Sequence, residues 1–130
     1  MDTSSLVLPM FGHVAWTALL YGLLTFVRAP DAWGIGRSKD GLNPYSSIES
    51  RISANLSNQF EWPVFFYAAC LVLMFLGSVE VYQFWLCWVF VVGRVVHSAV
   101  QLSTPKVRLR GIVFTINFVA VLLLWLSIIL

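Results

Sequence analysis

Charged residues are scarce in this chain. Of its 130 residues only 11% are Asp, Glu, Lys or Arg, while 59% are hydrophobic, and the mean hydropathy is +0.83. An ordinary soluble domain carries about 25% charged residues. The composition therefore excludes such a domain, and we expect membrane lipid rather than nucleic acid to surround or contact the chain.

Cysteine and histidine are rare as well, with two residues of each type. Cys70 and Cys87 lie inside apolar runs, where a cysteine behaves as a small buried hydrophobic residue, so we expect no disulfide framework. Neither His13 nor His97 has a Cys, His or Asp nearby at metal-ligand spacing. The sequence therefore predicts no metal site.

Apolar runs long enough to cross a bilayer, which takes roughly 20 residues, fill almost the whole chain. We predict an all-α integral membrane protein in which residues 1–130 form a single four-transmembrane-helix bundle. The expected helices cover about 5–28, 47–76, 80–102 and 105–130. The first run is not typical of a signal peptide, because its apolar core is long and its start carries Asp2 rather than basic residues.

The second expected helix carries three local signals. It is longer than the membrane requires, about 45 Å at 1.5 Å per residue, so its first turns should protrude. Ser46 and Glu49 have the spacing of a capping box. Pro63 lies in the helix interior, where it predicts a kink and frees the carbonyl of Gln59.

The basic residues gather at one end of the predicted bundle. The eight are Arg28, Arg37, Lys39, Arg51, Arg94, Lys106, Arg108 and Arg110. All lie in or near the connections after the first and third helices, and the opposite end has none. By the positive-inside rule we expect both of these connections in the cytoplasm and both termini on the opposite side.

Polar residues follow the helices at steps of three and four, which places them on one face of each helix. The second helix carries Arg51, Asn55, Asn58 and Glu61. The third carries Arg94, His97 and Gln101, and the fourth begins with Lys106, Arg108 and Arg110. Counting at about 1.5 Å per residue from the far membrane face places Glu61, Arg94 and His97 at a similar depth, and Arg110 with them. Because charges facing lipid cost several kcal/mol, we expect them to meet in one hydrated chamber, with Arg94 as the partner of Glu61.

Simpler explanations account for part of this pattern. Glu61 and Arg94 alone could form a structural ion pair, and lipid phosphates or topology control would explain Lys106 and Arg108. Arg110 is less well explained, because a cation near a helix N-terminus opposes the helix dipole. The excess of cations over one carboxylate favours an anionic ligand.

Two segments carry a resemblance to a known family. The first is "RISANLSNQFEWP", with Arg51, Asn58, Glu61 and Pro63 in order. The second is "GRVVHSAVQLSTPKVRLRGIVF", with Arg94, His97 and Arg110. Both resemble signatures of the membrane-associated proteins in eicosanoid and glutathione metabolism, the MAPEG family. The chain is similar to a bacterial-type or otherwise divergent member.

The resemblance implies a homotrimer that binds glutathione, its co-substrate, between neighbouring protomers near the cytoplasmic side. It implies that Arg110 is catalytic and stabilises the glutathione thiolate, since a nearby cation lowers a thiol pKa. The expected binding residues are Arg28, Arg51, Asn55, Asn58, Glu61, Arg94, His97 and Gln101.

The activity implied is that of a glutathione-dependent membrane transferase or peroxidase acting on lipophilic electrophiles. Phe114 and Gln101 stand where some eicosanoid-synthesising members have tyrosine, which argues against a specific prostaglandin or leukotriene synthase. Two alternatives remain open: a non-catalytic member that binds a lipid or a partner, and an unrelated structural or transport bundle.

Overall fold

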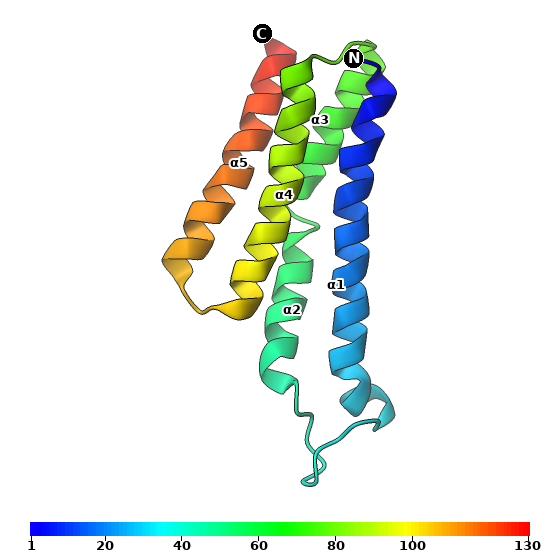
Figure 1. Ribbon diagram of the computed structural model, residues 1–130, viewed down its shortest axis with the longest axis vertical. Helices are drawn as coiled ribbons and strands as arrows, with labels where there is room; N and C mark the ends of the chain where they lie inside the picture. Colours follow the sequence, from blue (N-terminus) through cyan, green and yellow to red (C-terminus); the bar gives the residue numbers. More distant parts are fainter.

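The computed structural model describes all 130 residues and contains helices but no strand (Figure 1). The elements are η1 (Thr3–Leu6), α1 (Val7–Trp33), α2 (Ser46–Asn58), α3 (Pro63–Leu76), α4 (Val81–Ser103) and α5 (Val107–Ile129). They form four candidate membrane spans, because η1 continues into α1 and α2 continues into α3. The structure thus confirms the predicted all-α, four-span membrane bundle.

The spans pack as an elongated bundle in which α4 lies between α1 and α5 (Figure 1). Behind α4, α2 packs against α1, and α3 packs against α5. Both termini and the short 77–80 turn lie at one end, and the two polar connections lie at the other (Figure 1). The lower ends of α1 and α2 extend beyond those of α4 and α5, and for α2 this was predicted from its length.

The first helix is longer than expected, since α1 continues to Trp33 instead of ending near residue 28. Its last turn contains Pro30, which cannot donate a backbone hydrogen bond. Side chains of the following connection bond to the carbonyls at this end: Arg37 Nε donates to Pro30 O at 2.8 Å, and Asn43 Nδ2 donates to Val27 O at 2.9 Å. These contacts explain why α1 does not end at Arg28.

The predicted capping box at the start of α2 does not form. Ser46 is the first residue of α2, and no side chain caps this end. Glu49 instead pairs with Arg28, with 2.7 Å between Oε1 and Nε, because a charged donor is a stronger partner for a carboxylate than a neutral backbone N–H. A capping box is present at the start of α4, between Glu80 and Gln83.

At the other end of the chain's first helix, Asp2 caps η1. Its carboxylate accepts hydrogen bonds from the hydroxyl of Ser4 at 2.6 Å and from the backbone N–H of Ser4 at 3.2 Å. These bonds, the one from the hydroxyl first, lower the pKa of the Asp2 carboxyl. The cap gives the short helix a defined start before the apolar span.

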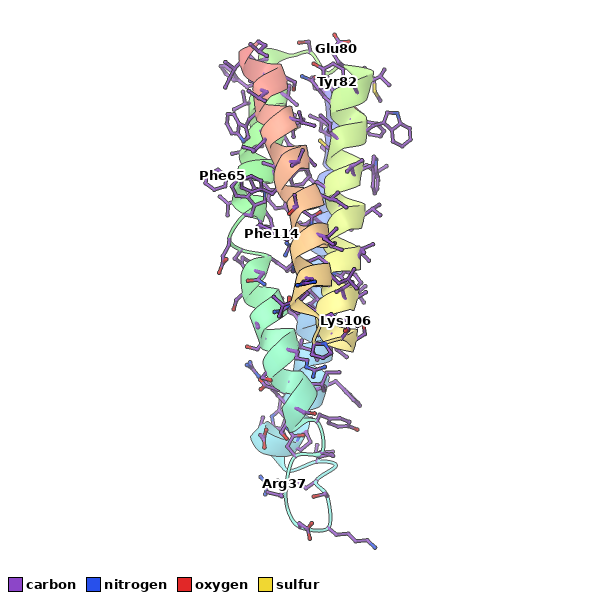
Figure 2. All side chains as sticks on the ribbon, turned by 90° about the vertical axis from the view of Figure 1, so that its left-hand side faces the viewer. Arg37, Phe65, Glu80, Tyr82, Lys106 and Phe114 are labelled. Carbon is purple, nitrogen blue, oxygen red and sulfur yellow. The ribbon has the colours of Figure 1, made fainter.

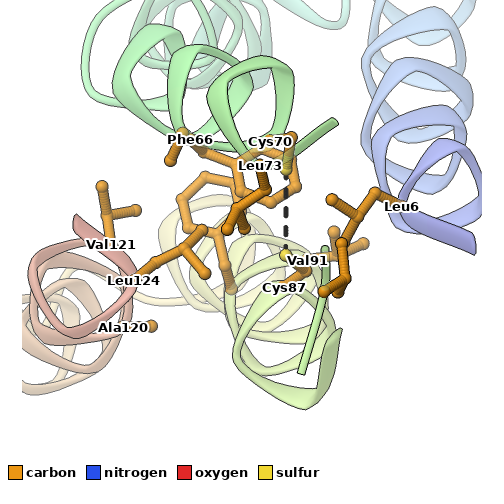
Figure 3. Packing of buried hydrophobic residues seen from close by; sticks show 12 residues of the cluster. Leu6, Phe66, Cys70, Leu73, Cys87, Val91, Ala120, Val121 and Leu124 are labelled. Carbon is orange, nitrogen blue, oxygen red and sulfur yellow. Dashed lines mark hydrogen bonds between the residues drawn. The ribbon is translucent and has the colours of Figure 1, made fainter. Parts of the chain in front are cut away.

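A dry apolar core fills the half of the bundle nearest the termini (Figure 3). The rings of Phe66 on α3 and Phe90 on α4 stack there with centroids 4.3 Å apart. Cys70 and Cys87 face each other with Sγ atoms 3.8 Å apart, and both thiols are free. This core holds α3, α4 and α5 together above the level at which polar groups begin.

Candidate ligand-binding site at the break between α2 and α3

The second span is interrupted at residues 59–62, where the chain leaves α2 after Asn58 and enters α3 at Pro63. Pro63 has no backbone N–H, which suits the first position of a helix. The expected kink is therefore an interruption of the span, in which the N–H groups of Gln59 and Phe60 close tight turns onto Leu56 O and Ser57 O. Residues 59–62 thus belong to neither helix.

A cavity of about 450 Å³ opens at this break, between α2, α3, α4 and α5. Its lining residues are Asn58, Glu61, Trp62, Phe65, Arg94 and Phe114. Figure 2 shows Phe65 and Phe114 at the level where α2 gives way to α3. Three of the residues predicted from sequence, Asn58, Glu61 and Arg94, meet here.

Glu61 and Arg94 share this cavity without forming the ion pair predicted from sequence. The one ion pair in the structure joins Arg28 and Glu49. Glu61 is exposed. Arg94 is 1% exposed, and its Nε donates to Gln59 Oε1 at 3.2 Å. The break thus separates the carboxylate from the guanidinium, and an amide takes the place that the carboxylate was expected to fill.

Two of the lining residues, Arg94 and Trp62, each have a side-chain donor without a hydrogen-bond partner. These donors, Arg94 Nη2 and Trp62 Nε1, are both buried. A buried donor without a partner costs about 1–3 kcal/mol, and more when it is charged. An anion in the cavity that accepts from both groups would remove this cost. The cavity is therefore suited to an anionic ligand.

Two further predicted residues lie beside the cavity without lining it. His97 is buried on α4, with its ring centroid 6.2 Å from that of Phe114, and its Nδ1 has no partner. Arg110 is half-buried on α5. His97 follows Arg94 by three residues and so lies on the same face of α4.

A comparison with protein families matches the MAPEG family over residues 6–130. The chain belongs to the MAPEG family. Membership points to a glutathione-related membrane protein of transferase or isomerase type. Comparisons with curated proteins and with solved structures found no match.

The other four predicted residues of this MAPEG protein lie outside the cavity. Asn55 and Gln101 are buried and bond to each other, Asn55 Nδ2 donating to Gln101 Oε1 at 2.8 Å. Arg28 is exposed and pairs with Glu49. Arg51 is exposed, and its Nη1 reaches Leu102 O at 3.5 Å. The single protomer therefore does not bring all nine residues together.

Sequence reasoning missed an interior polar network that joins α1, α2 and α4 below the apolar core. Ser98 Oγ donates to Asn55 Oδ1 at 2.7 Å and accepts from Trp16 Nε1 at 3.0 Å. Gln59 Oε1 contacts His13 Nε2 at 2.9 Å. A signal was available, since Gln59 follows Asn55 by four residues and so continues the same helical face.

Gln59 and His13 also line a second cavity, of about 400 Å³, on the α1 side of the break. Tyr67 joins them there, and its hydroxyl lies 2.6 Å from His13 Nδ1. The rest of the lining is mainly apolar. Gln59 thus lies between the two cavities, close to Arg94 on one side and to His13 on the other.

Proposed function

We propose that this MAPEG member is a glutathione-dependent transferase or peroxidase that acts on lipophilic electrophiles within the membrane. The observation that carries the proposal is the cavity at the helix break, which contains a fully buried arginine with an unpartnered Nη2. A buried cation of this kind calls for an anion. Family membership identifies glutathione as the anion to test first.

The groups of the cavity match those of glutathione, which has two carboxylates, an ammonium and a thiol. Arg94 Nη2 and Trp62 Nε1 would donate to a carboxylate, since charge-assisted hydrogen bonds are the stronger kind. Glu61, on the exposed side of the cavity, would accept from the ammonium. Asn58 would supply an amide between them. His97, on the same face of α4 as Arg94, would add a donor or an acceptor at Nδ1.

Arg110 would hold the thiol in its reactive form. A cation beside a thiol lowers its pKa and raises the fraction of thiolate at neutral pH. In a transferase reaction the sulfur then bonds to an electrophilic carbon, and the leaving group departs with the electron pair. The aromatic wall of Phe65 and Phe114, both exposed on this single protomer, would hold the lipophilic partner.

The proposal includes a homotrimer. In one protomer the cavity does not reach Arg28 or Arg51, and both are exposed. In a trimer these arginines would come from the surface of a neighbouring protomer and complete the site. We also propose that the two polar connections face the cytoplasm, because all eight basic residues lie toward that end of the bundle.

A non-catalytic role in lipid or partner binding is the second candidate, and one observation favours it. Phe114 presents no hydroxyl to the cavity, and Gly111, next to Arg110, has no side chain to offer one. A thiolate held here would receive hydrogen bonds from arginine but not from a neighbouring hydroxyl. Binding without turnover would then be the outcome of the assay below.

The full chain, purified in detergent, provides the test. Millimolar glutathione should raise its melting temperature, and the protein should conjugate glutathione to a generic aryl halide. Arg110→Ala should lower the conjugation rate at least tenfold, whereas Arg108→Ala, an exposed arginine on the same helix, should not. No stabilisation by glutathione would reject the transferase. Stabilisation without conjugation would identify the non-catalytic role.

A further inference from the structure

The amide of Gln59 is fixed in one orientation by its neighbours. It is 3% exposed. Its Oε1 accepts from Arg94 Nε at 3.2 Å, and its Nε2 donates to Asn55 Oδ1 at 3.2 Å and to Ser98 Oγ at 3.4 Å. A guanidinium has donors only, so the amide oxygen must face Arg94. No flipped amide would satisfy this arginine.

The same oxygen determines which nitrogen of His13 carries hydrogen. Gln59 Oε1 can only accept, so His13 Nε2, at 2.9 Å, must donate to it. The other ring nitrogen of neutral His13 then accepts from the hydroxyl of Tyr67 at 2.6 Å. The chain of bonds runs from Tyr67 through His13 to Gln59, and so braces the oxygen that holds Arg94 from the α1 side of the break.

A neutral hydrogen-bond partner affects the charge of Arg94 differently from a carboxylate. A buried carboxylate beside Arg94 would orient the guanidinium but would also cancel most of its field in the cavity. Gln59 orients Nε and adds no charge, and no carboxylate lies within 4.0 Å of Arg94. The Nη2 atom is left without a partner. Arg94 therefore keeps its charge and a donor that no other group of the protomer uses.

We propose that Gln59 is a positioning residue for anion binding, which holds Arg94 Nε by a neutral hydrogen bond braced by His13 and Tyr67 and leaves Nη2 to the ligand. The inference rests on the proposed function, because glutathione is taken as the anion. The proposal adds Gln59, which does not line the cavity, to a site whose other binding residues lie in or beside the cavity.

The main variant is Gln59→Glu in the full chain in detergent, with glutathione affinity measured by calorimetry. The new carboxylate has the same shape and pairs with Arg94, so affinity should fall at least tenfold. Gln83→Glu is the matched control, since Gln83 is also a buried glutamine, at the far end of α4 and outside the cavity. Its affinity should stay within twofold of the wild type.

A double-mutant cycle separates positioning from general damage to the fold. In an Arg94→Gln background, measured at raised glutathione concentration, Gln59→Glu should change affinity less than twofold, because its effect passes through Arg94. The same tenfold loss in both backgrounds would overturn the proposal. So would wild-type affinity in the folded single variant.

If Gln59→Glu does not fold, Tyr67→Phe gives a second route. It removes the hydroxyl that braces His13 and leaves Gln59 and Arg94 in place, so the KM for glutathione should rise about threefold with kcat unchanged. Unchanged KM would overturn the bracing part and, with no folded Gln59 variant, the proposal. Failure of the wild type to bind glutathione would reject the proposed function instead, before any of these variants is compared.

Discussion

The buried polar groups on the two sides of the α2–α3 break differ in one respect. On the interior side, no polar side-chain atom of Asn55, Gln59 or Ser98 is buried without a partner. On the cavity side, Arg94 Nη2 and Trp62 Nε1 are buried and unpartnered. Polar groups that satisfy one another hold helices together, whereas an unpartnered donor on a residue that lines a cavity leaves a hydrogen bond for a bound water, ion or ligand to make.

The largest effect should come from the cavity side. Arg94→Gln removes the charge and Nη2, so glutathione affinity should fall about 100-fold, or about 2.8 kcal/mol at 1.4 kcal/mol per factor of ten. The melting temperature of the ligand-free protein should change little, because an unpartnered buried charge is also lost. A large fall in melting temperature with unchanged glutathione affinity would show that Arg94 stabilises the fold and does not bind the ligand. Arg108→Gln serves as the control.

On the interior side the expected effect is on stability. Asn55→Leu removes the hydrogen bonds that the Asn55 side chain makes with Gln101, Gln59 and Ser98. The free energy of unfolding should therefore fall by about 2 kcal/mol. Asn58→Leu, the same substitution on the cavity side, removes no hydrogen bond of the protomer and should cost much less. Thermal unfolding in detergent measures both, and equal losses would show that the interior network carries no special stability.

Glu61 tests whether an exposed carboxylate at the break belongs to the site. Glu61→Gln should weaken glutathione binding about tenfold, because an amide accepts more weakly from an ammonium than a carboxylate does. The proposed homotrimer should remain assembled, since Glu61 makes no ion pair within the protomer. Size-exclusion chromatography and calorimetry check the two expectations, and a variant that dissociates or unfolds would make Glu61 a structural residue.

The smallest expected effect concerns a contact between α4 and α5 that belongs neither to the interior side nor to the cavity side of the break. A Cβ on Gly93 would overlap the side-chain oxygen of Asn117, which is fully buried. Small residues let membrane helices approach closely, so Gly93→Ala should lower the free energy of unfolding by about 1 kcal/mol. Gly22→Ala, where a Cβ meets nothing within 4 Å, is the control. A similar result for both variants would show that this close approach is not needed.

Some of the site was predictable and some was not, for a reason visible in the second span. Asn55 and Asn58 lie on one predicted stripe, yet Asn55 bonds inside the bundle and Asn58 lines the cavity. Periodicity assigns residues to a face, but a face about 120° wide meets two different neighbours here. Glu61 falls in the break, where helical periodicity no longer applies. The expected pair with Arg94 failed for that reason.

The sequence by itself determined the four apolar spans, the position of the break at Pro63 and the gathering of basic residues toward one end, because burial in lipid and a missing backbone N–H act locally along the chain. The tertiary structure alone decided which polar groups are satisfied. Gln59 reaches Arg94 and His13 only because α1 and α4 pack on opposite sides of it, and a contact between distant helices has no period in the sequence.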